Sequence, residues 1–294
     1  MKKHYWSCRI KFAFAGLALV LAGIGSLNAQ AEESFLSIKS EAGDYIGGGQ
    51  TFKLTPANTV FNAMASEDKR EVGISFTTST WWNLNMVAPL GQQLVPGIYE
   101  GATRWPFQGP FEPGLDFSGD GRGCNELTGR FQVLEAIYGP FGYVERFHAT
   151  FEQHCEGWTP ALFGEIKIVN PPAPPLLTLG LTLNREGTVQ RGNGAVSVSG
   201  TITCSATTTV QLSGTVTQRA NRFAMSIGFF SASVPCSTTP ATWSANASSN
   251  NGIPFNAGPA QVSVVGTATD PNFGNTVTEQ VSGLANFTGG KKRK

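Results

Sequence analysis

The chain has 294 residues, enough for one or two domains, and its 21 Lys and Arg residues nearly balance its 20 Asp and Glu residues. Charged residues make up only 14% of the chain. This composition argues against the broad basic face that binding to a phosphate backbone requires. We therefore expect no nucleic-acid partner.

The first 31 residues have the parts of a secretory signal peptide. An apolar run occupies residues 12–27, and Ala29-Gln30-Ala31 has the small-x-small pattern of a cleavage site. A membrane anchor is the alternative, but the run is short for the roughly 20 apolar residues of a spanning helix. We predict a secreted, periplasmic or cell-surface protein that starts at Glu32 and has no transmembrane segment after signal removal. Signal removal also takes away four basic residues, which are Lys2, Lys3, Arg9 and Lys11. The remaining chain then has 17 basic residues (21 − 4) and 20 acidic ones.

Short alternating segments dominate the rest of the chain. Apolar and polar side chains alternate in residues 73–87, 143–155, 177–183 and 196–204, which is the period of strands with one buried face. Gly and Pro interrupt the chain too often for long helices. A helix is predicted only near residues 57–70. Strands that each bury one face predict an all-β fold built from antiparallel sandwiches or barrels.

An exposed tryptophan is the first candidate for ligand binding. The alternation in residues 73–87 places Trp81 on the polar face beside Asn83 and Asn85, while Trp82 points inward. Such a tryptophan can stack on the apolar face of a sugar ring while the amides bond to hydroxyl groups. Packing against another aromatic ring or against the second domain is the alternative. Trp105 and Trp158 are predicted on loops that extend the same surface or cap a sheet edge.

A candidate calcium loop lies at Asp116-Phe117-Ser118-Gly119-Asp120-Gly121. Asp116, Ser118 and Asp120 would supply alternate oxygen ligands to a structural Ca²⁺. The bidentate glutamate of a helical calcium hand is absent, since Leu127 occupies that position. A tight turn before a strand explains the same residues. No other cofactor is predicted.

A second metal hypothesis rests on the predicted strand at residues 143–155. His148, Glu152 and His154 share its outward face, and Glu152 and His154 would be close enough to share a zinc ion. A solvated polar face explains the same pattern. No local catalytic signature is present, so no catalytic residue is assigned. A hydrolase with two paired carboxylates remains an alternative because such pairs leave no local pattern.

Four cysteines remain after the signal, and an even number in an exported chain predicts two disulfides. Three pairings are possible. The pairing that keeps each bridge within its own half of the chain is favoured, and zinc is disfavoured because there is no Cys-x-x-Cys pair. The favoured bridges are Cys124–Cys155 and Cys204–Cys236.

The run Pro171-Pro172-Ala173-Pro174-Pro175 predicts a semi-rigid linker. Most charges and tryptophans precede it, and a Thr-, Ser- and Val-rich segment follows it. We expect β domains at residues 32–170 and 176–288, each with one internal disulfide. A basic tail follows at residues 289–294, which we interpret as a frayed solubilising end.

The second half resembles bacterial immunoglobulin-like domains in its length, strand density and single bridge. It departs from the antibody pattern because no tryptophan lies between Cys204 and Cys236. The first half resembles an uncharacterised domain of exported bacterial proteins, and this resemblance implies no particular chemistry. Three stretches carry it, namely Leu94-Val95-Pro96-Gly97-Ile98-Tyr99, Gly119-Asp120-Gly121-Arg122-Gly123-Cys124-Asn125 and Phe151-Glu152-Gln153-His154-Cys155-Glu156-Gly157.

These features favour an exported, non-catalytic binding or adhesion protein. Its first domain would recognise an extracellular ligand, either a glycan or a protein, and its second would serve as a spacer. The alternatives are a hydrolase acting on extracellular polysaccharide and a structural component of the envelope or matrix.

Overall fold

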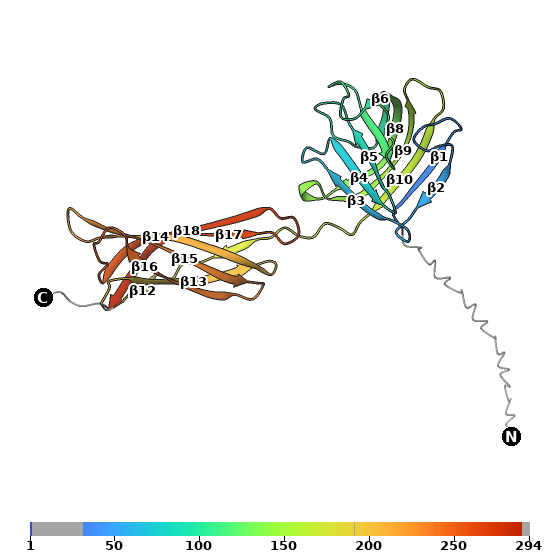
Figure 1. Ribbon diagram of the computed structural model, residues 1–294. Helices are drawn as coiled ribbons and strands as arrows, with labels where there is room; N and C mark the ends of the chain where they lie inside the picture. Colours follow the sequence, from blue (N-terminus) through green and yellow to red (C-terminus); the bar gives the residue numbers. More distant parts are fainter. Residues whose placement is uncertain (2–31, 191, 290–294) are drawn as a thin grey trace.

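The computed structural model describes residue 1, residues 32–190 and residues 192–289 (Figure 1). The predicted signal peptide beyond Met1 and the basic residues 291–294 lie outside this part of the chain. Apart from one three-residue 3₁₀ turn, η1 (Pro140–Gly142), all the regular elements in the described residues are strands. The prediction of an all-β fold is therefore confirmed.

Ten strands form the first sheet, in the order β2-β1-β10-β9-β8-β6-β7-β5-β4-β3. All neighbours are antiparallel except β6 and β7, which pair in parallel at Thr103 and Gly114. The sheet is open, with β2 and β3 at its edges. Its strands are β1 (Phe35–Ser40), β2 (Thr51–Leu54), β3 (Val60–Ala65), β4 (Glu71–Thr77), β5 (Trp81–Val87), β6 (Gly97–Arg104), β7 (Gly114–Gly119), β8 (Leu127–Tyr138), β9 (Val144–Cys155) and β10 (Leu162–Val169).

The first sheet folds over its own aromatic core. Trp82 of β5 stacks on Phe117 of β7 with ring centroids 5.1 Å apart, and Phe117 lies 5.7 Å from Phe151 of β9. Because β7 and β9 are not neighbours in the sheet, two parts of it must face each other across this core. Phe52 of the edge strand β2 also reaches Trp82, at 5.9 Å.

The helix predicted near residues 57–70 is wrong. Residues Val60–Ala65 form β3, which pairs with β4 along its whole length. Ala63 and Ala65 are buried on one side while Val60 and Met64 are exposed. The segment thus follows the period of two, and the chain satisfies its backbone hydrogen bonds between strands instead of within a helix.

A buried glutamine completes the core of the first sheet. Gln153 of β9 is fully buried; its Oε1 accepts from the Phe117 N–H at 2.8 Å, and its Nε2 donates to the Phe117 carbonyl at 2.9 Å. Phe117 lies beyond the two residues of β7, Gly114 and Leu115, that pair with β6. The side-chain amide therefore takes the place of a neighbouring strand and satisfies both backbone groups.

Eight strands form the second sheet, and it closes into a barrel. The chain of neighbours runs β11-β13-β12-β18-β17-β14-β15-β16, and β16 pairs back with β13 from Ala241 to Ala247. β12, near the start of this part of the chain, pairs in parallel with β18 at its end. The pairing runs from Glu186 opposite Asn286 to Val189 opposite Gly289. The strands are β11 (Leu179–Leu181), β12 (Glu186–Val189), β13 (Val196–Cys204), β14 (Thr208–Arg219), β15 (Met225–Cys236), β16 (Ala241–Ser249), β17 (Gly258–Thr269) and β18 (Thr276–Gly289).

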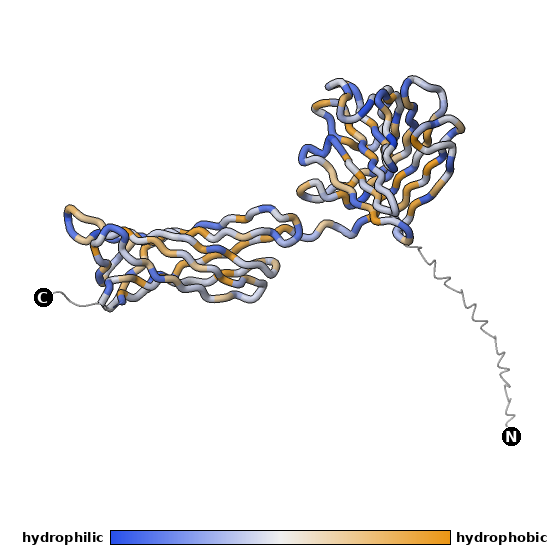
Figure 2. The backbone as a smooth tube through the Cα atoms, in the orientation of Figure 1, coloured by the Kyte–Doolittle hydropathy of each residue, from blue (hydrophilic) through white to orange (hydrophobic). Residues whose placement is uncertain are grey.

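Small and β-branched residues fill most of the second core, around a single tryptophan. Trp243 is buried, stacks on Phe230 at 6.2 Å, and donates its indole N–H to the Thr182 carbonyl at 3.2 Å. Figure 2 shows apolar residues recurring along the strands of both sheets, as alternation requires. The two buried clusters have no residue in common.

Each sheet contains one disulfide. Cys124 is bonded to Cys155, and Cys204 to Cys236, so the favoured pairing is confirmed. The segment of residues 171–175 lies between the two sheets without forming a strand. Beyond this segment Phe273, in the turn between β17 and β18, contacts Phe141 at 5.6 Å and Tyr143 at 6.4 Å.

Candidate functional site

Two sites predicted separately from the sequence lie on one surface of the first sheet. Asn83 pairs with Ser118, and Asn85 pairs with Asp116, across β5 and β7. These side chains are on the face opposite the core residues Leu84 and Phe117. Trp81 begins β5 at the end of this surface, and its side chain is 57% exposed. We call the surface of Trp81, Asn83, Asn85, Asp116 and Ser118 the β5–β7 face.

Asp116 is the most buried polar group of the β5–β7 face. Its side chain is only 9% exposed, and its Oδ2 accepts a 2.6 Å hydrogen bond from the Ser118 hydroxyl. Burial raises the pKa of Asp116, and the Ser118 hydrogen bond and the positive charge of Arg104 only partly oppose this. The carboxyl group therefore favours its neutral form more than an exposed aspartate does.

The candidate calcium residues occupy a strand and a turn. Asp116 and Ser118 belong to the extended strand β7, and Asp120 follows it in a left-handed turn with φ 52°. The Asp120 carboxylate pairs with Arg122 at 3.2 Å. Nowhere in the described residues do three or more His, Cys, Asp or Glu side chains form a group that could hold a metal ion. Calcium binding stays a prediction. It predicts that the thermal stability of the protein falls when a chelator is added and recovers when calcium is restored.

The other two predicted tryptophans lie apart from each other. The Trp105 N–H donates to the Leu115 carbonyl at 3.1 Å, which places half-buried Trp105 next to Asp116 and the β5–β7 face. Trp158 is exposed in the turn after β9, where its N–H donates to the carbonyl of Cys155 at 2.9 Å. Among the described residues, no aromatic contact joins two of the three tryptophans.

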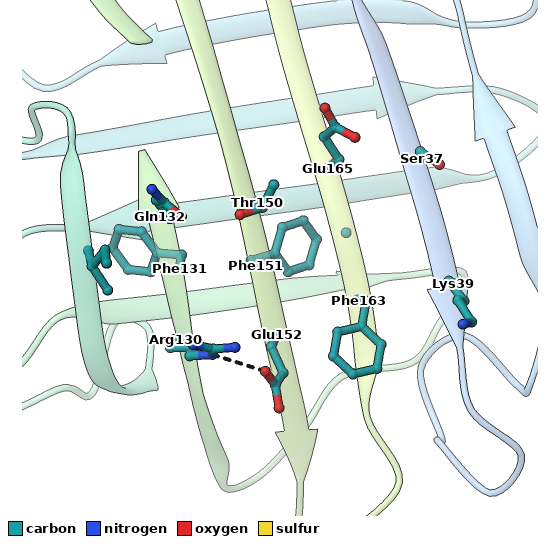
Figure 3. A pocket seen from close by; sticks show the side chains of 12 residues that line it. Ser37, Lys39, Arg130, Phe131, Gln132, Thr150, Phe151, Glu152, Phe163 and Glu165 are labelled. Atoms are coloured by element: carbon teal, nitrogen blue, oxygen red, sulfur yellow. Dashed lines mark hydrogen bonds and ion pairs between the residues drawn. The ribbon is translucent and has the colours of Figure 1, made fainter. Parts of the chain in front are cut away.

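A larger concave site lies elsewhere on the first sheet. A groove of about 370 Å³ crosses the outer face of β1, β10, β9, β8 and β6 (Figure 3). Its volume lies near the lower end of the range for small-molecule sites, roughly 300–1,000 Å³. We call it the outer groove. The outward side chains that line it are Ser37, Lys39, Ile98, Arg130, Gln132, Thr150, Glu152, Phe163 and Glu165.

The outer groove combines apolar surface with fixed charges. Phe163 is 37% exposed and Ile98 is 64% exposed, so both offer apolar contact area to a ligand. Arg130 Nε donates to Glu152 Oε2 at 3.0 Å, and a second carboxylate, Glu100, lies 3.6 Å from Arg130. Figure 3 shows the Arg130–Glu152 pair beside the Phe163 ring.

Glu152 is held in its ionised form. A hydrogen bond with His154 at 3.1 Å is the main reason that the pKa of Glu152 lies below its usual range, and the hydrogen bond from Arg130 adds to the effect. His154 also contacts the Thr159 carbonyl through Nδ1 at 3.0 Å. Each carboxylate oxygen has one partner, which fixes the geometry of Glu152 before any ligand arrives and leaves a further acceptor site on each oxygen.

The residues of the zinc hypothesis pair among themselves and with a neighbour. His148 Nε2 lies 2.8 Å from Glu165 Oε1, while His154 pairs with Glu152. All three lie on the outward side of β9 as the alternation predicted. Each imidazole thus faces one carboxylate, an arrangement that orders the rim of the outer groove.

On the core side of the sheet beneath the outer groove, a glycine makes room for an aromatic ring. Gly164 of β10 is paired with Phe151 of β9, and a Cβ at Gly164 would collide with the Phe151 ring. Sequence alternation identified the outward side chains of β9 but not the groove. Its other walls come from β1, β8 and β10, whose order in the sheet is set by pairing between distant segments.

A smaller hollow lies on the second sheet. It has a volume of about 270 Å³, is lined by Phe229 together with Ser213, Thr215 and Ser263, and contains no charged side chain. It offers little for orienting a polar ligand.

No helix in the described part of the chain has the length and apolar character needed to cross a membrane. No protein-family model matches the chain, and no curated protein matches it either.

Proposed function

We propose that this is an exported binding protein and that the outer groove recognises a saccharide chain. The observation that carries the proposal is the groove itself, where an exposed aromatic ring lies next to a preformed Arg–Glu pair. Saccharides present both apolar C–H faces and closely spaced hydroxyl groups, so they need both kinds of surface at once.

The apolar part of the groove suits a sugar ring. Packing a pyranose face on Phe163 removes apolar area from water at about 25 cal/mol per Å². Ile98 widens that surface on the far side of β8 and β9. Only one broad ring is available, which favours binding of a chain end or a short segment over a long flat polymer.

The polar part suits hydroxyl groups. Arg130 offers several N–H donors and Glu152 offers acceptors, in a geometry that the Arg130–Glu152–His154 contacts fix in advance. Gln132, Thr150 and Lys39 add donors and acceptors around the ring. Preorganisation of this kind reduces the entropy that binding would otherwise cost.

Binding is favoured over hydrolysis by the state of Glu152. A glycosidase needs a carboxylic acid whose pKa is raised so that it can protonate the leaving oxygen. The pKa of Glu152 is lowered, and Glu165, the other carboxylate in the outer groove, is paired with His148. The carboxylates serve better as hydrogen-bond acceptors than as a proton donor.

A glycan array followed by calorimetry with a retained glycan tests the proposal. Phe163→Ala should weaken binding by roughly tenfold or more, because it removes most of the apolar contact of one ring. Glu152→Gln should weaken binding further by removing the charged acceptor and loosening Arg130. Trp81→Ala is the matched control, since it removes an exposed aromatic ring on the β5–β7 face.

Two results would contradict this assignment. Unchanged binding by Phe163→Ala together with loss of binding by Trp81→Ala would move the site to the β5–β7 face. Release of reducing ends from a retained glycan, abolished by Glu152→Gln, would instead identify a hydrolase.

A further inference from the structure

The hairpin between β14 and β15 ends in an ordered tip with an exposed phenylalanine. The Ala220 N–H donates to the Ala224 carbonyl at 3.0 Å, and the Phe223 N–H donates to Asn221 Oδ1 at 2.8 Å. Phe223 is 84% exposed although its backbone is fixed. A single exposed apolar side chain is ordinary, but a contiguous exposed apolar patch marks an interaction surface.

Apolar exposure continues from the tip along β15. Met225, Ile227 and Phe229 are exposed on successive outward positions of the strand. Neighbouring outward positions are about 7 Å apart along a strand. Phe223, Met225 and Ile227 therefore form an apolar stripe of about 14 Å, two steps of about 7 Å, long enough to extend through the 5–10 Å depth of the interface between lipid headgroups and acyl chains.

Basic residues surround the tip. The guanidinium of Arg222 lies 4.4 Å over the ring of Phe223, and Arg219 donates through Nε to the Asn221 carbonyl at 3.3 Å. No ion pair of the described residues includes either arginine. Their charges are thus available to an external anion.

All but one of the acidic residues of the second sheet lie away from the tip. Residues 187–269 contain no Asp or Glu. Asp270 follows the far end of β17, and Glu279 pairs with Gly266 toward that same far end, whereas the tip lies beside the start of β17 near Gln261. Glu186 is the exception: it opens β12 and pairs with Asn286, which places it at the same end of the sheet as the tip, with β18 and β17 between it and β14.

The chain leaves the second sheet at the end that carries the tip. β18 ends at Gly289, and its residue Phe287 pairs with Gly258 at the start of β17. The last described residue, Gly289, therefore lies at the same end of the sheet as the β14–β15 tip.

We infer that this end of the second sheet docks on an anionic phospholipid surface. Phe223, Met225 and Ile227 enter the interface, while Arg219 and Arg222 face the phosphate groups. An apolar stripe combined with basic residues is the pattern of interfacial membrane attachment, where apolar burial and electrostatic attraction add. This inference stands independently of the saccharide proposal, since the groove lies on the other sheet.

Vesicle sedimentation tests this docking. The purified protein, whose N terminus is first read by mass spectrometry, is mixed with vesicles of phosphatidylcholine and phosphatidylglycerol (7:3) or of phosphatidylcholine alone. We expect binding to the anionic vesicles that weakens with added salt, because surface charges are screened within about 10 Å at 0.1 M. Phe223→Ser should weaken it by about tenfold, the order of magnitude expected for one buried phenylalanine.

Matched variants separate docking from general stickiness. Phe111→Ser removes a phenylalanine of similar exposure, 82%, in the loop between β6 and β7 and should leave binding unchanged. Phe223→Leu should retain binding, because it keeps an apolar side chain. Arg219→Gln and Arg222→Gln should each weaken binding to anionic vesicles several-fold, because each removes one positive charge at the tip.

Several results would overturn the inference. These are no binding of the unaltered protein to the anionic vesicles, binding that Phe223→Ser leaves unchanged, and equal binding to both vesicle types. Retention on heparin without vesicle binding would identify a polyanion site instead. Self-association that disappears in Phe223→Ser, without vesicle binding, would identify a second copy of the chain as the partner.

Discussion

The first sheet is open and includes every ion pair found among the described residues, whereas the second sheet is closed and includes none of them. The first also has two edge strands and a groove with charged walls, while the hollow on the second has no charged side chain. The comparison shows that the same strand period supports two different surfaces. The charged groove lies on the first sheet, and an exposed apolar stripe lies at one end of the second.

The two cores also differ in how they use tryptophan. Trp82 stacks within a group of phenylalanines that joins distant parts of the open sheet. Trp243 packs against Phe230 and makes its hydrogen bond inside the closed sheet. If the two cores are independent, removal of one tryptophan should affect one sheet alone.

The largest expected effect comes from these two tryptophans. Trp243→Ala should destabilise the second sheet by about 3–5 kcal/mol, because it leaves a large cavity and an unpaired carbonyl at Thr182. Trp82→Ala should do the same to the first sheet. Calorimetry should show two unfolding transitions, of which each variant lowers only one. Trp81→Ala, the exposed neighbour, should change stability by less than about 0.5 kcal/mol, and a single shared transition would refute independent cores.

A smaller effect is expected from the buried amide that only the open sheet requires. Gln153→Leu keeps the volume but leaves the N–H and carbonyl of Phe117 without partners, at a cost of about 1–3 kcal/mol for an unsatisfied buried group. Urea unfolding of the first sheet measures the loss. Gln92→Leu, at an exposed position, is the control, and equal stability of the two variants would show that Gln153 does not support β7.

The smallest expected effect depends on pH. Burial raises the pKa of Asp116 above its ordinary value of 3.8, so the folded state holds a proton that the unfolded state has already released. Stability from this group is complete below pH 3.8 and is lost as the pH rises through the higher folded pKa. Asp116→Asn should therefore be more stable than the unaltered protein at pH 7 and similar to it at pH 3.5.

Urea midpoints at both pH values measure this difference. Asp120→Asn, whose carboxylate is largely exposed and pairs with Arg122, is the matched control. A variant Asp116→Asn that is less stable at pH 7 would mean that the ionised carboxylate stabilises β7.

The alternation of side chains was sufficient to predict strands and their buried faces. The inward position of Trp82 and the outward positions of Trp81, His148, Glu152 and His154 are all as expected. The pairing of the cysteines followed from their placement in separate halves. These properties depend on short segments, where a period of two acts directly on burial.

Properties that depend on strand order could not be predicted. The outer groove needs β1 beside β10, although more than 100 residues separate Phe35 from Lys167 in the chain. The β5–β7 face unites Asn85 and Asp116 through pairing across 31 residues (116 − 85). The error at residues 57–70 has a different origin, because β3 is a short edge strand whose pattern is clear only once its partner β4 is known.

The parallel pairing of β12 with β18 determines how the second sheet would respond to a mechanical load. β12 lies near the start of this sheet and β18 at its end, so tension applied between the linker and the last residues pulls the two strands in opposite directions along their length. The hydrogen bonds between them are then loaded simultaneously in shear and do not open one after another. If the two ends of the second sheet were pulled apart, the force would pass through the β12–β18 pair. Loading in shear is the direction in which that pair resists separation most strongly.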